Sequence, residues 1–127
     1  MRHLSRALVL ALLLALAGCS NRPKLVSVTG KLVQDGKGLT GGNIWFHPAE
    51  GNPYKGEKPS CQLQLDGSFV MRTYPWGNGV PPGSYKVTLA PELASRINRP
   101  AYSDPARTPL TLDVPDSGVA DKVFEVK

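Results

Sequence analysis

The chain has 127 residues, of which 13 are Gly and 12 are Pro, and it carries a formal net charge of +5. So much Gly and Pro leaves little room for long helices and favours short strands joined by turns. The basic residues are scattered singly. The sequence therefore lacks the basic run or helix face that nucleic-acid binding requires, and we expect no nucleic-acid partner.

The first 18 residues have the features of an export signal. Arg2 and Arg6 give a positive start, and residues 7–17 form an apolar run without a charge. A helix needs about 20 apolar residues to cross a bilayer, so this run is too short to span one. A basic start, a short apolar stretch and small residues before a break predict a signal peptide that is cleaved. An ordinary secretory signal cut near Ala17 is the simpler interpretation.

The sequence Leu16-Ala17-Gly18-Cys19 resembles the lipobox of bacterial lipoproteins in all four positions. The resemblance implies that the Cys19 thiol carries diacylglycerol, that the chain is cleaved before Cys19, and that the new amino group is acylated, with palmitate as an expected chain. Two or more acyl chains hold a protein stably on a bilayer. We therefore expect membrane attachment through Cys19. Ser20 stands where an Asp often retains lipoproteins at the inner membrane, which favours the outer membrane.

The organisation that follows is a signal peptide over residues 1–18, a lipidated tether over 19–24, and one folded domain over 25–127. Seven segments of this domain have the spacing of short strands, with apolar residues alternating on one face. They are residues 25–33, 41–48, 61–65, 68–73, 84–90, 110–114 and 122–126. Asp35-Gly36 and Asp66-Gly67 predict hairpin turns, because these dipeptides accept positive φ. Residues 91–109 contain four Pro and predict at most a helical turn over 92–97.

Half-buried antiparallel strands of this kind pair into two sheets with a core between them. The sequence therefore predicts an all-β fold, a seven-stranded antiparallel β-sandwich, with a small barrel as the alternative. The inward phase of the strands gives the predicted core: Val28, Leu32, Ile44, Phe46, Leu63, Leu65, Phe69, Val87, Leu89, Leu112, Phe124 and Val126.

Three stretches also carry a resemblance to a known family. They are "VTGKLVQDGKGLTGGNIWFHP", "LQLDGSFVMRT" and "GVPPGSYKVTLA". In this order they resemble the carboxypeptidase regulatory-like domain, a transthyretin-like sandwich of seven strands, and the chain is similar to short planctomycete lipoproteins that contain it. The resemblance implies a non-catalytic module at the cell envelope, since such domains mostly lack activity of their own. Transthyretin-like hydrolases use several His and a C-terminal Tyr-Arg-Gly-Ser motif, which this chain lacks.

No catalytic constellation is apparent in the sequence. His47 is the one His after the signal, and its position at a strand end predicts a surface residue. Cys61 has no disulfide partner once Cys19 is acylated, and it is expected to be a buried small hydrophobe rather than a reactive thiol. One Cys and one His cannot supply the three or four ligands of a zinc site. We expect no enzyme activity, no metal and no cofactor.

Tyr74 and Trp76 are the candidate binding residues, because both lie in a loop rich in Pro and Gly. Exposed rings on a β-sandwich can stack on sugar faces, so the pair predicts a possible glycan-binding site. The alternative is that Trp76 folds back to cap the open end of the core. Tyr85 follows Pro82-Gly83 and is expected to fix the loop through its hydroxyl, as in the tyrosine corner of other sandwiches.

Two functions follow from these observations. The leading hypothesis is a lipid-anchored, non-enzymatic envelope protein with a structural or protein-interaction role. The alternative is a carbohydrate-binding module held at the envelope. The partners would be the membrane, through the lipid on Cys19, and an unidentified envelope protein or polysaccharide.

Overall fold

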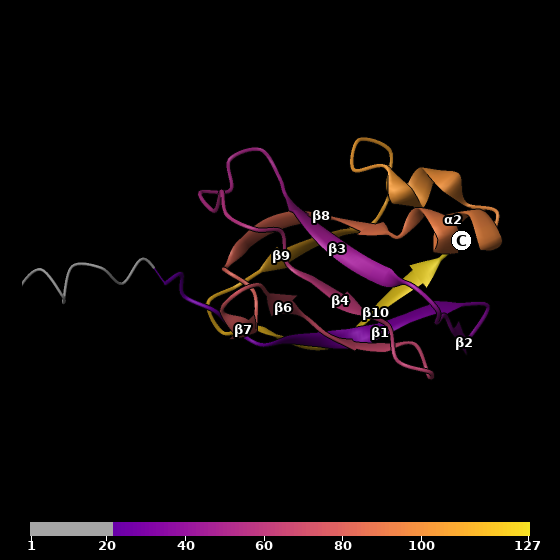
Figure 1. The fold of residues 1–127 in the computed structure, drawn as a ribbon, viewed down its shortest axis with the longest axis horizontal. Helices are drawn as coiled ribbons and strands as arrows, with labels where there is room; N and C mark the ends of the chain where they lie inside the picture. The colour runs from indigo at the N-terminus through magenta and orange to yellow at the C-terminus, as the bar shows by residue number, and fades with distance from the viewer. Residues whose placement is uncertain (1–21) are drawn as a thin grey trace, which may run out of the picture.

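The computed structural model describes residues 22–127. Within this range the chain forms ten strand segments in two sheets, together with one short α-helix and one 3₁₀ helix (Figure 1). The predicted all-β class is confirmed. Residues 1–21, which hold the predicted signal peptide and Cys19, lie outside the described residues.

The two sheets differ in size and strand order. The first has the order β10-β1-β2, with β5 also paired to β1. Its strands are β1 (Val28–Gln34), β2 (Lys37–Gly38), β5 (Ser68–Val70) and β10 (Val119–Val126). The second has the order β7-β6-β4-β3-β8-β9. Its strands are β3 (Asn43–Pro48), β4 (Ser60–Gln62), β6 (Arg72–Thr73), β7 (Gly77–Asn78), β8 (Gly83–Leu89) and β9 (Thr111–Val114).

Both sheets bury their inner faces in one hydrophobic core, to which β1 and β10 contribute from one side and β3 and β8 from the other (Figure 1). Every predicted core residue except Leu65 is buried. The rings of Phe69 and Phe124 stack with centroids 5.8 Å apart. Gly30 makes room for them, because a Cβ there would lie 2.6 Å from the Phe69 ring. Burying a side chain of this size contributes about 1.5–3 kcal/mol, so this core carries most of the stability.

Leu65 was placed in the predicted core, and that assignment is wrong. Its side chain is 93% exposed. The alternating pattern of "CQLQL" ends at Leu63, because the chain turns from Gln64 to Gly67, whose N–H donates to the Gln64 carbonyl at 2.9 Å. Leu65 therefore lies in the turn rather than on a strand.

The predicted strand over residues 68–73 is divided between the sheets. Its first half, β5, pairs with β1, whereas its second half, β6, pairs with β4. The crossing falls at Met71, which is fully buried and whose N–H donates to the Val28 carbonyl at 3.0 Å. This division, with the two-residue strands β2 and β7, accounts for ten segments where the sequence predicts seven.

The expectation of a wholly antiparallel fold is also corrected. Strands β1 and β10 run parallel, from Val28 opposite Val119 to Gln34 opposite Val126. The loop after β9 returns the chain to the start of β1, where the Val119 N–H donates to the Ser27 carbonyl at 2.8 Å. Alternation determines which face a strand buries and not the direction of its neighbour, so the pattern did not reveal this pair.

Residues 91–110 complete the core at one end of the sheets. Helix α2 (Pro91–Arg96) and the 3₁₀ helix η1 (Pro100–Ser103) bury Leu93, Ala94 and Tyr102. Helix α2 lies beside the C-terminus in Figure 1, at the end of the sheets opposite β7. The predicted helical turn therefore exists, but its contribution to the core is larger than the sequence pattern indicated.

Candidate functional site

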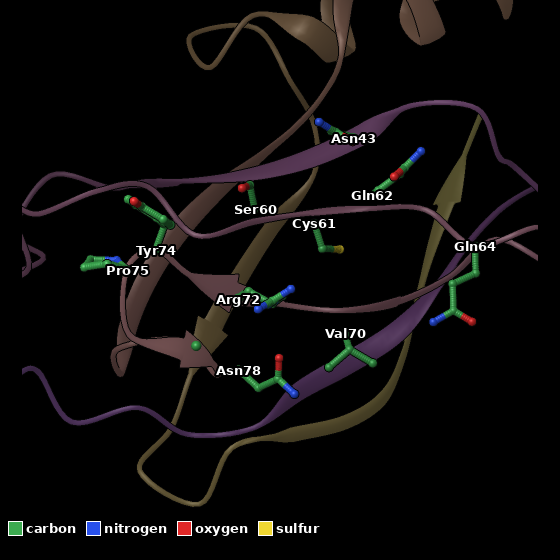
Figure 2. A pocket seen from close by; sticks show the side chains of 11 residues that line it. Asn43, Ser60, Cys61, Gln62, Gln64, Val70, Arg72, Tyr74, Pro75 and Asn78 are labelled. Atoms are coloured by element: carbon green, nitrogen blue, oxygen red, sulfur yellow. The ribbon is translucent and has the colours of Figure 1, made fainter.

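An open groove of about 740 Å³ lies along β4 and β6 of the second sheet and extends to Val70 at the end of β5 (Figure 2). We call it the outer groove. Most of its side chains are polar and uncharged. It is lined by Asn43, Ser60, Cys61, Gln62, Gln64, Val70, Arg72, Tyr74, Pro75, Gly77 and Asn78.

The strand register aligns four outward side chains across the sheet. Trp45 is opposite Ser60, Ser60 is opposite Arg72, and Arg72 is opposite Asn78. Directly opposed residues point to the same face, about 5 Å from one another. Figure 2 shows Ser60, Arg72 and Asn78 next to one another along this line. We call Trp45, Ser60, Arg72 and Asn78 the cross-strand row.

The cross-strand row combines hydrogen-bonding groups with one aromatic ring and one cation. Trp45 is 41% exposed, on the face opposite to the buried Ile44 and Phe46. Within residues 22–127 the ion pair is Lys24–Asp116, so no described carboxylate pairs with Arg72. The guanidinium has five N–H donors and the amide of Asn78 both donates and accepts. This face is therefore suited to binding a polar ligand rather than to acid–base chemistry.

Cys61 lines the outer groove and is half-buried. Its Sγ lies 3.5 Å from the Met71 Sδ. Burial raises the pKa of the thiol to about 11, against a smaller opposing effect of a hydrogen bond from the backbone of Val70. A nucleophilic Cys needs its thiolate form. At neutral pH Cys61 is therefore a protonated thiol in an apolar contact.

His47 is half-buried rather than fully at the surface. Its Nε2 lies 2.8 Å from the hydroxyl of the buried Thr88. Burial, and secondarily the charge of Lys58, lowers its pKa. Among residues 22–127 no group of three His, Cys, Asp or Glu is placed to hold a metal ion. Asp66 accepts from the Ser68 N–H and Asp104 from the Ala106 N–H, so both serve turns.

The structure separates the two predicted glycan-binding residues. Tyr74 is 78% exposed and lines the outer groove, whereas Trp76 is 39% exposed and does not line it. The aromatic pairs of the described chain are Phe46 with Tyr85 and Phe69 with Phe124, so Tyr74 and Trp76 form no stacked platform. We call residues 74–76 the aromatic tip.

Tyr85 has the structural role expected of it. Its side chain is 1% exposed and its hydroxyl donates to the Pro81 carbonyl at 2.6 Å. This bond closes the loop between β7 and β8 against the core, as in a tyrosine corner.

The sequence did not identify Arg72, Asn78 and Trp45 as members of one surface. Strand alternation placed Trp45 and Arg72 outward, whereas Asn78 lies in a segment that the sequence predicted as a loop and the structure assigns to β7. The register that aligns the three depends on long-range pairing. In the described chain no helix is long and apolar enough to cross a membrane. Cys19, the predicted lipid-attachment residue, lies outside the described residues. No family model matches the chain, and neither the curated proteins nor the solved structures include a match.

Proposed function

We propose that this chain is a lipid-anchored, non-enzymatic protein of the cell envelope, held at the outer membrane by acyl chains on Cys19. Its two sheets would form a β-sandwich of the carboxypeptidase regulatory-like, transthyretin-like type. The role would be structural or that of a contact for another envelope protein. The observation that carries the proposal is the lipobox-like Leu16-Ala17-Gly18-Cys19 placed directly before a folded β domain.

The spacing between anchor and domain supports this proposal. Among residues 22–127, Val26 is the first that pairs with another segment, through the bridge to Val80. It follows Cys19 by seven residues. Seven residues span at most about 25 Å even when fully extended. A lipid on Cys19 would therefore hold the domain close to the bilayer.

The chemistry of the described residues supports a non-enzymatic role. The raised pKa of Cys61 keeps its thiol protonated, and the Thr88 hydroxyl that lies 2.8 Å from the His47 ring is buried, with 3% of Thr88 exposed, so it is closed to a substrate. Nucleophilic catalysis needs a nucleophile and a base within hydrogen-bond reach of each other. The outer groove supplies binding groups instead.

The test of the anchor is metabolic labelling with a fatty-acid analogue. The full chain and the Cys61→Ala variant should incorporate the label and fractionate with membranes. Cys19→Ala should incorporate none and keep its signal peptide. Because Cys61→Ala removes the other cysteine, it is the matched control. Label entering Cys19→Ala would contradict the proposal.

The second candidate function is a carbohydrate-binding module, favoured by the exposed Tyr74 beside the polar side chains of the outer groove. An aromatic ring can cover the apolar face of a sugar while amides bind its hydroxyls. Tyr74→Ala and Asn78→Ala should then weaken retention on an envelope polysaccharide column. Tyr54→Ala, in another loop, is the control. Equal retention of all variants would remove this candidate.

A further inference from the structure

The aromatic tip lies at the end of the molecule where the described chain begins, at residue 22 (Figure 1). Val26 and Val80 exchange backbone hydrogen bonds of 3.0 and 2.8 Å, and Leu25 packs next to Gly79. Figure 1 shows β7 and the start of the described chain at the same end of the sheets, away from α2 and the C-terminus. Leu25 and Val26, near the start of the described chain, are therefore neighbours of the segment that follows the aromatic tip.

Hydrogen bonds fix the loop that carries the aromatic tip. The Trp76 N–H donates to the Thr73 carbonyl at 2.8 Å, and the buried Thr73 hydroxyl donates to the Gly79 carbonyl at 2.8 Å. Tyr74 and Trp76 are nevertheless 78% and 39% exposed. Large rings on a rigid loop with this exposure have apolar surface available for a second contact.

The length of chain before the domain indicates what covers these rings. The distance from Cys19 to Val26 is at most about 25 Å, because seven residues separate them. Trp76 precedes Val80 by four residues, so it lies within about 14 Å of that contact. A bilayer that holds the lipid on Cys19 would therefore be within reach of the aromatic tip.

The chemistry of this end also suits a bilayer surface. Trp and Tyr concentrate at membrane–water interfaces, where an apolar ring and a polar group meet the headgroups together. Arg22 and Lys24, which belong to the tether, are exposed. Lys24 forms an ion pair with Asp116 at 3.6 Å, but both groups are exposed, and such a pair is weak enough for anionic lipid to compete with it.

We propose that the aromatic tip inserts into the headgroup region of the membrane that carries the Cys19 lipid. It would act as a second contact, which turns the β7 end of the domain toward the bilayer and the α2 end away from it. The inference rests on the proposed lipid anchor. It assigns Trp76 to lipid rather than to the outer groove, in agreement with its absence from the groove lining.

Tryptophan emission tests the inference, because the chain has two Trp residues. The full acylated chain is placed in vesicles of phosphatidylcholine and phosphatidylglycerol whose acyl chains are brominated near the headgroup. Trp45→Phe leaves Trp76 as the reporter, and Trp76→Phe leaves Trp45, on the outer sheet face, as the matched control. Brominated lipid should quench most of the Trp76 emission and leave the Trp45 emission unchanged. Adding Tyr74→Ser to the Trp45→Phe chain should reduce that quenching.

Flotation of the same vesicles separates this inference from the anchor. A chain that floats with the vesicles but shows equal quenching of Trp76 and Trp45 retains the anchor and overturns the tip contact. A chain that does not float overturns both. Trp76 emission that responds to a soluble polysaccharide and not to brominated lipid would assign the tip to carbohydrate, and would also overturn the contact.

Discussion

Tyr74, before β7, and Tyr85, in β8, have opposite environments. Tyr85 is 1% exposed and bonds the Pro81 carbonyl, whereas Tyr74 is 78% exposed and makes no pair with another ring. Between them the chain passes from an exposed surface, with Tyr74 and Trp76, to the core, with Val80. Tyr85 stabilises the fold and Tyr74 contributes to the surface, although only eleven positions separate them. Each residue can therefore be substituted without changing the role of the other.

The largest effect is expected from Tyr85→Ala. Truncating a buried aromatic side chain costs about 3–5 kcal/mol, because the ring contacts are lost and a cavity remains. Tyr74→Ala and Tyr54→Ala remove rings from surface loops, where changes usually stay within about 0.5 kcal/mol. Denaturant unfolding of purified residues 20–127 measures all three. Equal midpoints for Tyr85→Ala and Tyr54→Ala would contradict the assignment of faces.

A smaller loss of stability is expected from Thr73→Val, which removes the hydrogen bond from the buried Thr73 hydroxyl to the Gly79 carbonyl. The substitution keeps the shape of the side chain but leaves the Gly79 carbonyl without the hydroxyl that donates to it. A buried acceptor left unpaired costs about 1–3 kcal/mol. Thr73→Ser retains the hydroxyl and is the control. If both variants unfold at the same denaturant concentration, the hydroxyl does not stabilise the loop.

The two Asp-Gly turns show how far local sequence predicts this fold. Asp35 and Gly36 have φ of 53° and 77° and close the β1–β2 hairpin as predicted. Gly67 also has positive φ, at 85°, yet its turn carries the chain from β4 in one sheet to β5 in the other. The dipeptide determines the turn conformation, because positive φ is a local property. It does not determine which strands pair afterwards.

The candidate site was predictable to the same limited extent. Alternation placed Trp45 outward and Tyr85 inward, because each depends on the phase of its own strand. The alignment of Ser60, Arg72 and Asn78 depends on pairing between strands, which a single sequence does not encode in a readable pattern. The exposure of Trp76 depends on how its loop meets the core, and its sequence left both positions open.

The stability of the fold should fall at alkaline pH because Tyr85 is buried as a neutral phenol. Burial raises the pKa of its phenol from 10.0 to about 12. In the unfolded chain Tyr85 ionises near pH 10, whereas in the folded chain it keeps its proton to about pH 12. The stabilisation from the neutral phenol is therefore complete below pH 10 and is lost as the pH rises toward 12.

Tyr85→Phe is the matched variant for this measurement. At neutral pH it should lose about 1 kcal/mol, the usual value of one hydrogen bond. Between pH 10 and 12 its stability should fall less steeply than that of the parent, because the other titrating groups are common to both chains. Parallel stability curves across this range would show that Tyr85 titrates alike in the folded and unfolded states.

The smallest effect is expected from a chelator or a reducing agent, neither of which should change the thermal stability of the domain. A structural metal adds its binding free energy to folding, and a disulfide typically adds about 2–4 kcal/mol. Residues 20–127 contain Cys61 as their one cysteine and His47 as their one histidine, so they offer a single thiol and a single imidazole. Stability should then rest on the core between the sheets, and thermal unfolding should be unchanged by EDTA or reductant. A loss of 2–4 kcal/mol would lower the midpoint by many degrees in a domain of this size, since about 1 kcal/mol corresponds to roughly 4–8 °C. A fall with EDTA would reveal a metal site, and a fall with reductant would reveal a bridge between Cys61 residues of two chains.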